Sequence, residues 1–196
     1  MSLLQDIVVF LCGFVVPLRL VAAQVPLPGG CPKVQVVNDF QAPRYLGKWY
    51  EAEKYFFVFE LGGKCVTATY TDLGNGTIGV YNSNFNTITN SQSDIQGTAT
   101  LADPSVAKLE VRFPSVPGNF GAPYWVVDTD YTGYALVWSC NDFGFIHTVT
   151  SWILTREQHP SANVLNKAYA AASKNQINKK FFMKTDQNDC PVRGPP

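Results

Sequence analysis

The sequence lacks the residue patterns of the common enzyme active sites. It contains only two histidines, His147 and His159, and no spacing of cysteine and histidine of the kind that holds zinc. No Gly-x-Ser-x-Gly, His-Glu-x-x-His or P-loop motif occurs in its 196 residues. We therefore expect a protein that is not an enzyme and that holds no metal and no other cofactor.

The chain also has no excess of charge of either sign. Lysine and arginine together number 15, as do aspartate and glutamate, and the formal net charge is zero. Removal of residues 1–23 would take away one acid, Asp6, and one base, Arg19, so the balance would not change. Because nucleic-acid-binding proteins usually carry a basic face, we expect no nucleic-acid partner.

Apolar runs long enough to cross a membrane are absent as well. The N-terminal run Ile7–Val16 is too short to span a bilayer, and the later Val21-Ala22-Ala23 has the small-residue pattern of a signal-peptide cleavage site. We predict a signal peptide over residues 1–23, a single mature domain over residues 24–196, and a secreted, extracellular protein without a transmembrane segment. Because no basic residue precedes the run, a buried N-terminal strand or helix is the alternative.

Cysteine is scarce, and the number of cysteines fits a secreted protein. Loss of the signal peptide would remove Cys12 and leave four of the five cysteines, an even number that indicates two disulfides in a secreted chain. Three pairings of Cys31, Cys65, Cys140 and Cys190 are open on this count alone. Four free buried thiols are the alternative, which an oxidising compartment disfavours.

What the mature chain does have is a regular series of short strand patterns. Residues 24–45 are rich in proline and indicate an extended arm. Beyond them, turn signals such as Asp72–Gly76 and Asn141–Gly144 separate runs of β-branched and aromatic residues. Together with the segment around Trp49, these runs predict eight strands at the spacing of a meander, which favours a barrel or a sandwich. The runs are Val66–Thr71, Thr77–Asn82, Ser93–Leu101, Lys108–Phe113, Tyr124–Asp128, Tyr134–Cys140 and Thr148–Thr155.

One helix pattern follows the last strand. After His159-Pro160-Ser161, apolar residues recur at helical intervals from Val164 to Ala172, which predicts an amphipathic helix packed on the outside of the barrel. Pro160 suits the first turn of such a helix. Residues Asn178–Lys184 are predicted to add a short final strand.

A glycine-rich segment, Gly74–Gly79, matches the spacing of a dinucleotide-binding loop but lies in the wrong context. That loop needs a helix after its glycines, whereas the residues after Gly76 have a strand pattern and Asn75-Gly76 is a hairpin turn signal. We therefore predict a hairpin. Asn75 also begins the N-glycosylation sequon Asn75-Gly76-Thr77, which predicts a glycan at this turn; an unused sequon is the alternative.

Two acids lie close to Trp49 in the sequence. Glu51 and Glu53 are two residues apart, and strand alternation would place both on one face. On an inward face, one of them could tune a ligand pocket. Acid–base catalysis is the weaker alternative, because no other catalytic group accompanies them. His159 is expected at the surface, and His147 has no evident partner.

Three short motifs give the chain a specific resemblance. Gly47-Lys48-Trp49 resembles the Gly-x-Trp signature that opens the first lipocalin strand, Thr129-Asp130-Tyr131 resembles the turn motif of that family, and Arg156 follows its strand as the third signature arginine does. The resemblance implies an all-β fold, an eight-stranded up-and-down antiparallel β-barrel with one C-terminal α-helix packed outside. It also implies that Trp49 closes the barrel floor with Arg156 stacked on it.

Further segments are similar to the apolipoprotein D-like branch, close to insect bilin-binding and Lazarillo-type lipocalins. They are Tyr45–Glu51, Ala107–Val111, Ala122–Trp125, Tyr134–Val137 and Trp152–Leu154. In that branch the disulfides would join Cys31 to Cys140 and Cys65 to Cys190. A paired Cys65 argues against a lipocalin-type isomerase, which uses a free thiol in its pocket.

The function that this resemblance implies is a secreted carrier of a small hydrophobic ligand. Lipids, sterols, fatty acids, retinoids, carotenoids and bilins are the candidate ligands, for transport or sequestration, and a cell-surface receptor or a lipoprotein particle is a candidate partner. A secreted interaction or signalling lipocalin and a lipocalin-type isomerase are the alternatives. Alignment on the signatures predicts a mostly apolar ligand-binding wall made of Glu51, Tyr70, Asn82, Ile95, Leu109, Val111, Phe113, Tyr124, Val126, Val137, Ser139, Thr150 and Trp152.

Overall fold

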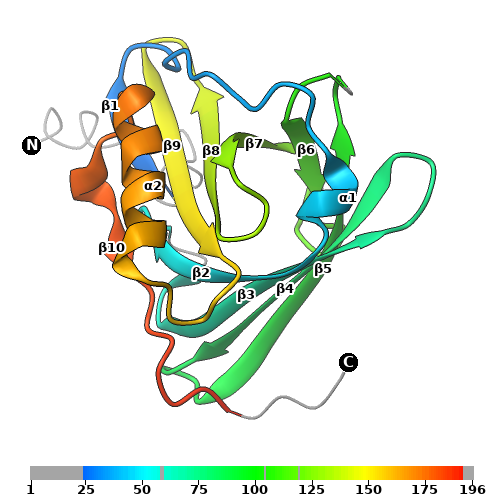
Figure 1. Cartoon of the computed structure of the whole chain (residues 1–196), viewed down its shortest axis with the longest axis vertical. Coiled ribbons are helices and arrows are strands. Elements are labelled where there is room, and N and C mark those ends of the chain that lie inside the picture. Colours follow the sequence, from blue (N-terminus) through cyan, green and yellow to red (C-terminus); the bar gives the residue numbers. More distant parts are fainter. Residues whose placement is uncertain (1–23, 58–59, 104, 119, 192–196) are drawn as a thin grey trace, which may run out of the picture.

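A closed antiparallel β-barrel forms the centre of the computed structural model, which describes residues 24–57, 60–103, 105–118 and 120–191 (Figure 1). The barrel strands follow one another around the wall in chain order, and the wall closes where β9 pairs with β2. The predicted eight-stranded up-and-down barrel is thus confirmed, with each predicted run inside or overlapping a strand. The barrel strands are β2 Gly47–Lys54, β3 Gly63–Asp72, β4 Thr77–Asn86, β5 Ser91–Leu101, β6 Lys108–Arg112, β7 Ala122–Thr129, β8 Tyr134–Asp142 and β9 Ile146–Thr155.

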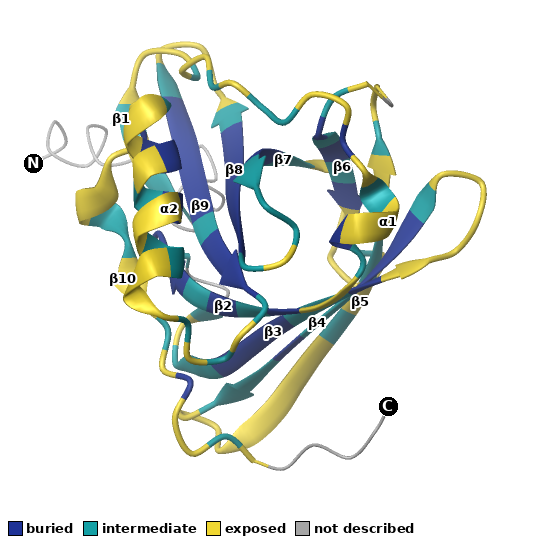
Figure 2. Ribbon diagram, viewed as in Figure 1, coloured by how far each residue is buried: buried dark blue, intermediate teal, exposed yellow. Residues whose placement is uncertain are grey.

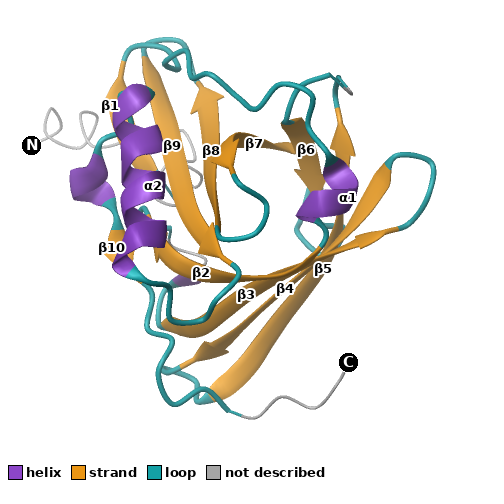
Figure 3. Ribbon diagram, in the orientation of Figure 1, coloured by secondary structure: helices purple, strands orange, loops and turns teal. Residues whose placement is uncertain are grey.

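The remaining elements lie outside the barrel, across its closed end or alongside its first strand (Figure 3). The predicted C-terminal helix α2 contacts β7, β8 and β9 from outside. It begins after Ser161 and not at Pro160, because the Ser161 side chain accepts a hydrogen bond from the backbone N–H of Val164 and caps the helix. These elements are β1 Val25–Pro28, α1 Ala42–Tyr45, α2 Ala162–Lys174, the 3₁₀ helix η3 Lys179–Phe181 and β10 Met183–Lys184.

Alternation along the strands produces two apolar cores, one on each side of the wall (Figure 2). On β8, Ala135 and Val137 face the barrel interior, whereas Leu136 and Trp138 face α2. Both faces of β8 are therefore buried. This is why residues 134–140 form a nearly continuous apolar run instead of alternating with polar residues.

The N-terminal arm is more ordered than predicted. Residues 24–45, expected to be irregular, include strand β1 and the short helix α1. β1 pairs with β9 as an edge strand, where prolines 26 and 28 are tolerated because no further strand needs their missing N–H. The expectation that His147 has no partner is wrong, since its Nδ1 lies 2.8 Å from the carbonyl oxygen of Gly29 and holds the arm.

Two disulfides tie the chain ends to the barrel. Cys31 is joined to Cys140 and Cys65 to Cys190, which confirms the predicted pairing. The paired residues are 109 and 125 positions apart in the sequence. In the chain-entropy account, closing loops of this length stabilises a fold by roughly 4–5 kcal/mol each.

The C-terminal segment fills a gap in the barrel wall between β2 and β3. β3 pairs only with the first half of β2, Gly47–Tyr50, and β10 takes its place beside the second half. The side-chain amide of Gln187 then donates to the carbonyl oxygens of Glu51 and Val66, both at 2.9 Å. The segment is therefore part of the wall that surrounds the interior, and the Cys65–Cys190 disulfide holds it there.

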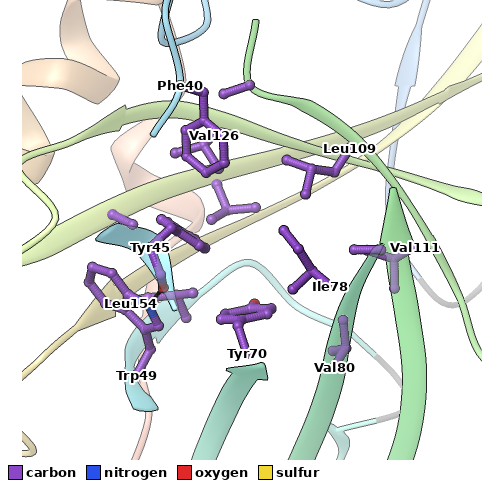
Figure 4. Packing of buried hydrophobic residues seen from close by; sticks show 14 residues of the cluster. Phe40, Tyr45, Trp49, Tyr70, Ile78, Val80, Leu109, Val111, Val126 and Leu154 are labelled. Atoms are coloured by element: carbon purple, nitrogen blue, oxygen red, sulfur yellow. Dashed lines mark hydrogen bonds between the residues drawn. The ribbon is translucent and has the colours of Figure 1, made fainter. Parts of the chain in front are cut away.

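Trp49 closes one end of the barrel (Figure 4). Its side chain is fully buried, and its indole N–H donates to the carbonyl oxygen of Tyr45 at 2.8 Å. The guanidinium of Arg156 lies 3.7 Å from the ring centroid, a cation–π contact that stabilises the fold by about 0.5–2 kcal/mol. Gly47, directly beside this contact, has a φ of +89°, a backbone conformation that favours glycine.

Replacing Trp49 by alanine should destabilise the fold and leave ligand preference unchanged. The expected loss in the free energy of unfolding is about 3–5 kcal/mol, because a large buried ring is removed and Arg156 loses its stacking partner. Thermal and urea unfolding measure the loss. Trp125→Ala is the control, since Trp125 packs on the outer face. A Trp49→Ala protein with an unchanged melting temperature and an altered ligand preference would contradict this division of roles.

Candidate functional site: the barrel interior

Most of the predicted wall residues meet in one apolar cluster inside the barrel. Figure 4 shows its centre, where Tyr70, Leu109, Val111 and Val126 converge from β3, β6 and β7. Their contact with a ligand stays a prediction, but the sequence places them correctly on a shared inner face. The predicted members of the cluster are Tyr70, Leu109, Val111, Val126 and Val137, which are buried, and Phe113, Tyr124 and Trp152, which are half-buried against them.

Four other predicted wall residues lie on the inward faces of their strands. Asn82 lies opposite Ile95 on β5, and Ser139 lies opposite Thr150 on β9. The buried Oδ1 of Asn82 and Oγ1 of Thr150 have no hydrogen-bond partner in the described part of the chain. The buried Oδ1 of Asn84, which sequence reasoning missed, has none there either. Buried polar atoms are almost always paired, so these groups are suited to orient a ligand.

A β-bulge separates the two acids that were predicted to share a face. Glu51 pairs with Leu154 of the inner cluster, but the register then shifts, and Glu53 pairs with Ile153 of the outer core. Ala52 is the extra residue. The expectation that Glu51 and Glu53 lie on one face is therefore wrong, because period-two counting fails across a bulge. Lys54, two positions beyond the bulge, joins Glu51 on the inner side.

Glu51 belongs to a buried group of charges. The Nζ of Lys54 lies 3.0 Å from its Oε1 and also donates to the carboxylate of Glu60, and Thr185 donates its hydroxyl to Glu51. Burial first, and then the nearby Glu60 charge, raise the pKa of Glu51 to about 8 against the lowering effect of Lys54. Burial alone would lower the pKa of Lys54, but the two carboxylates raise it.

Three tyrosines form a hydrogen-bonded group near the closed end. The hydroxyl of Tyr124 lies 2.8 Å from that of Tyr45 and 2.7 Å from that of Tyr70. Burial raises the pKa of Tyr70 to about 12, so this hydroxyl stays protonated at neutral pH. Sequence reasoning found Tyr70 and Tyr124 but missed Tyr45, although it lies two residues before the Gly47-Lys48-Trp49 motif, because it belongs to α1 and not to a strand.

The open end of the barrel is rimmed by exposed apolar side chains. The described residues 55–57, 60–62, 87–90, 113–118, 120–121 and 143–145 form it, in loops opposite the end closed by Trp49. These loops contain one charged residue, the acid that binds Lys54. Large apolar side chains in these loops are exposed to solvent, with exposed fractions from 42% to 83%. They are Phe56, Leu61, Ile88, Val116, Phe120, Phe143 and Phe145.

Three further observations concern features that other functions would need. Among residues 24–191, apart from those that the structure leaves undescribed, no cluster of histidine, cysteine and acidic side chains could hold a metal ion. No helix in the described chain is long and apolar enough to cross a membrane. Each of its four cysteines is bonded to another cysteine, so none offers a thiol to the interior.

Comparison with known proteins agrees with this geometry. The model of the lipocalin / cytosolic fatty-acid binding protein family matches residues 46–189, which is most of the chain. The chain belongs to the lipocalin family. Its motifs have the structural roles that the resemblance implied: Thr129 and Asp130 accept hydrogen bonds from backbone N–H groups in the turn between β7 and β8, and Arg156 donates to the carbonyl of Tyr131 at 3.0 Å.

Individual lipocalins resemble it over most of their length. Apolipoprotein D of Mus musculus is 37% identical over 166 residues, covering 83% of this chain and 85% of the relative. The Lazarillo protein of Schistocerca americana is 36% identical over 166 residues, covering 81% and 75%. The solved structure of insecticyanin from the tobacco hornworm Manduca sexta superposes with a TM-score of 0.74 at 25% identity, covering 83% and 89%.

Replacing Glu51 by glutamine should flatten the dependence of stability on pH. The folded protein keeps the Glu51 proton up to about pH 8, whereas an unperturbed glutamate loses it near pH 4.5. Folding therefore takes up a proton in this window, and wild-type stability falls as the pH rises through it. Melting temperatures from pH 4 to 9 measure the slope, with Glu157→Gln on the surface as the control. An equal slope in wild type and Glu51→Gln would contradict the assignment.

Proposed function

We propose that this lipocalin is a secreted carrier that binds one small hydrophobic ligand inside its barrel. The single observation that carries the proposal is the interior itself, where side chains from β3 to β9 form an apolar wall with a few unpaired polar atoms. Apolar burial, at about 25 cal/mol per Å², would drive uptake, and the polar atoms would fix the orientation of the ligand. The interior suits a lipid, sterol, fatty acid, retinoid, carotenoid or bilin.

Secretion is part of the same proposal. The predicted signal peptide, residues 1–23, lies outside the described residues, and the two disulfides are the feature that favours an oxidising compartment. Asn75 is exposed at the tip of the predicted hairpin between β3 and β4, with a φ of +52°. A glycan at its sequon would extend into solvent without touching the barrel, so we infer that Asn75 is glycosylated.

The apolar rim supports a lipid surface, such as a lipoprotein particle or a membrane, as the source of the ligand. Exposed apolar patches of this kind on soluble proteins usually mark a contact with a partner or a lipid. The rim surrounds the open end, so a barrel resting on lipid would receive its ligand without passing it through water. The near absence of charge in these loops favours an interaction that does not depend on anionic lipids.

A carrier role without catalysis agrees with the cysteines. A lipocalin-type isomerase would need a free thiol in the pocket, whereas Cys65 is bonded to Cys190. The similarity to apolipoprotein D and to the Lazarillo protein, at 37% and 36% identity, also supports the carrier proposal.

Extraction of the native protein is the direct test of this function. Organic solvent should release a hydrophobic molecule in a stoichiometric amount from purified, secreted protein, and mass spectrometry and absorbance should identify it. The same protein unfolded and washed before extraction is the control for adsorbed lipid. A barrel that is empty when purified and that refuses lipids, retinoids and bilins would contradict the carrier proposal and favour an interaction or signalling role.

Trp152 should report ligand binding through its fluorescence. Its ring packs against the inner cluster and lies 5.9 Å from that of Phe57 in a loop of the open end, so a ligand in the upper barrel would contact it. Titration with retinol should quench the emission, and Trp152→Phe should remove most of the change.

The other indoles serve as internal controls for this titration. Trp49 lies at the closed end, and Trp125 and Trp138 pack on the outer face as predicted. Saturable retinol binding with an unchanged signal from a protein that keeps only Trp152 would remove this residue from the site.

A further inference from the structure

A hollow of about 360 Å³ lies outside the barrel, lined by residues of α2, β10 and the outer side of β2 and by residues in and next to η3. Figure 1 shows α2 and β10 beside β2. A neighbouring hollow of about 240 Å³ shares Glu53 and Lys184 with it. The barrel interior has no part in either. The residues that line the larger hollow are one acid, two aromatic residues and two bases: Glu53, Tyr169, Phe182, Lys179 and Lys184.

Glu53 at the base of this hollow is a buried carboxylate without a cation. Only 4% of the residue is exposed, and the bulge at Ala52 turns it away from the barrel interior. The hydroxyl of Tyr169 donates to its Oε1 at 2.5 Å. Its other oxygen has no hydrogen-bond partner in the described chain, and no lysine, arginine or histidine there forms an ion pair with it. A carboxylate in this position that pairs with no cation attracts a cationic ligand group.

The two aromatic residues specify what kind of cation suits the hollow. The ring of Phe182 is held by an edge contact with Tyr55 at a centroid distance of 4.8 Å, and Tyr169 is held by its bond to Glu53. Aromatic faces beside an acid are the arrangement that recognises quaternary ammonium groups, which cannot donate hydrogen bonds and bind through cation–π attraction.

The two lysines of the hollow favour a negatively charged group on the same ligand. Lys179 and Lys184 are exposed, and neither forms an ion pair with an acid of the described chain. The Nζ of Lys179 lies 5.9 Å from the ring centroid of Tyr169, on the same hollow as the acid. Ammonium groups at this position bind phosphate as point charges.

From these three features we propose that the hollow binds phosphocholine. The trimethylammonium group lies against Glu53, Tyr169 and Phe182, and the phosphate lies between Lys179 and Lys184. Phosphocholine carries a positive and a negative group a few bonds apart, and the hollow places an acid and two lysines close together. Its source is either free phosphocholine or the headgroup of a phosphatidylcholine surface. The site is separate from the barrel interior and does not depend on the carrier function.

NMR titration of the full mature chain with free phosphocholine tests the site. Saturable shifts are expected in the amides of β10, η3 and the facing turn of α2. Glu53→Gln and Phe182→Leu should each weaken binding by about tenfold or more, since each removes one partner of the cation. Choline and inorganic phosphate should each bind more weakly than phosphocholine, because each satisfies only half of the hollow.

Two controls separate binding from folding and from general attraction to lysine. Lys180→Gln changes an exposed lysine next to Lys179 that does not line the hollow, and it should leave the affinity unchanged. The melting temperature and the retinol titration of each variant show whether its barrel is intact. Absence of saturable shifts at millimolar phosphocholine would overturn the proposal. So would equal affinity for inorganic phosphate, or unchanged affinity in a folded Glu53→Gln or Phe182→Leu protein.

Vesicles distinguish the two sources of the ligand. Flotation with phosphatidylcholine vesicles should retain wild type more than Glu53→Gln, and free phosphocholine should compete, if the headgroup is the ligand. Equal retention of the two proteins, together with saturable binding of free phosphocholine, would identify free phosphocholine as the ligand. Any retention that the apolar rim provides is common to both proteins and cancels in the comparison.

Discussion

The closed end of this barrel depends on the hydrogen bonds of one guanidinium. Arg156 donates to the carbonyl oxygens of Arg44, Lys48 and Tyr131, at 3.0, 2.9 and 3.0 Å, while its plane lies over Trp49. These carbonyls belong to α1, to β2 and to the turn after β7, so one side chain joins segments that are far apart in the sequence. The fixed, planar array of donors is specific to arginine, and a lysine would provide the charge without the geometry.

Because the contacts that close the barrel lie at this end, the loops of the open end do not need to close it. These loops carry exposed phenylalanines that a stability argument alone does not explain, whereas Tyr45, Trp49 and Tyr70 at the other end are packed and hydrogen-bonded. The wall between the two ends is less uniform than a simple meander. β2 and β3 part halfway along, and the C-terminal segment with Gln187 closes the gap. The chain end is thus a structural part of the container.

The bulge in β2 gives one short strand two different chemical faces. Glu51 lies among Lys54, Glu60 and Thr185 at the inner side, where burial raises its pKa. Glu53 lies under α2, where a tyrosine hydroxyl is its one hydrogen-bond partner in the described chain. A single inserted residue therefore separates an acid that belongs to the barrel interior from one that belongs to an outer hollow.

The sequence by itself determined the eight strands and the outer helix, because these follow from turn residues and from the periodicity of apolar side chains. The choice of a barrel over a sandwich and the residues of the inner wall followed from the resemblance to lipocalins. The disulfide pairing came through family resemblance. Only the tertiary structure decided the position of Glu53, the partner of His147 and the place of the C-terminal segment. No local pattern marks the bulge at Ala52, and alternation counted across it assigns the wrong face. Gln187 and Val66 are 121 residues apart, and their contact exists only once the barrel has closed around them.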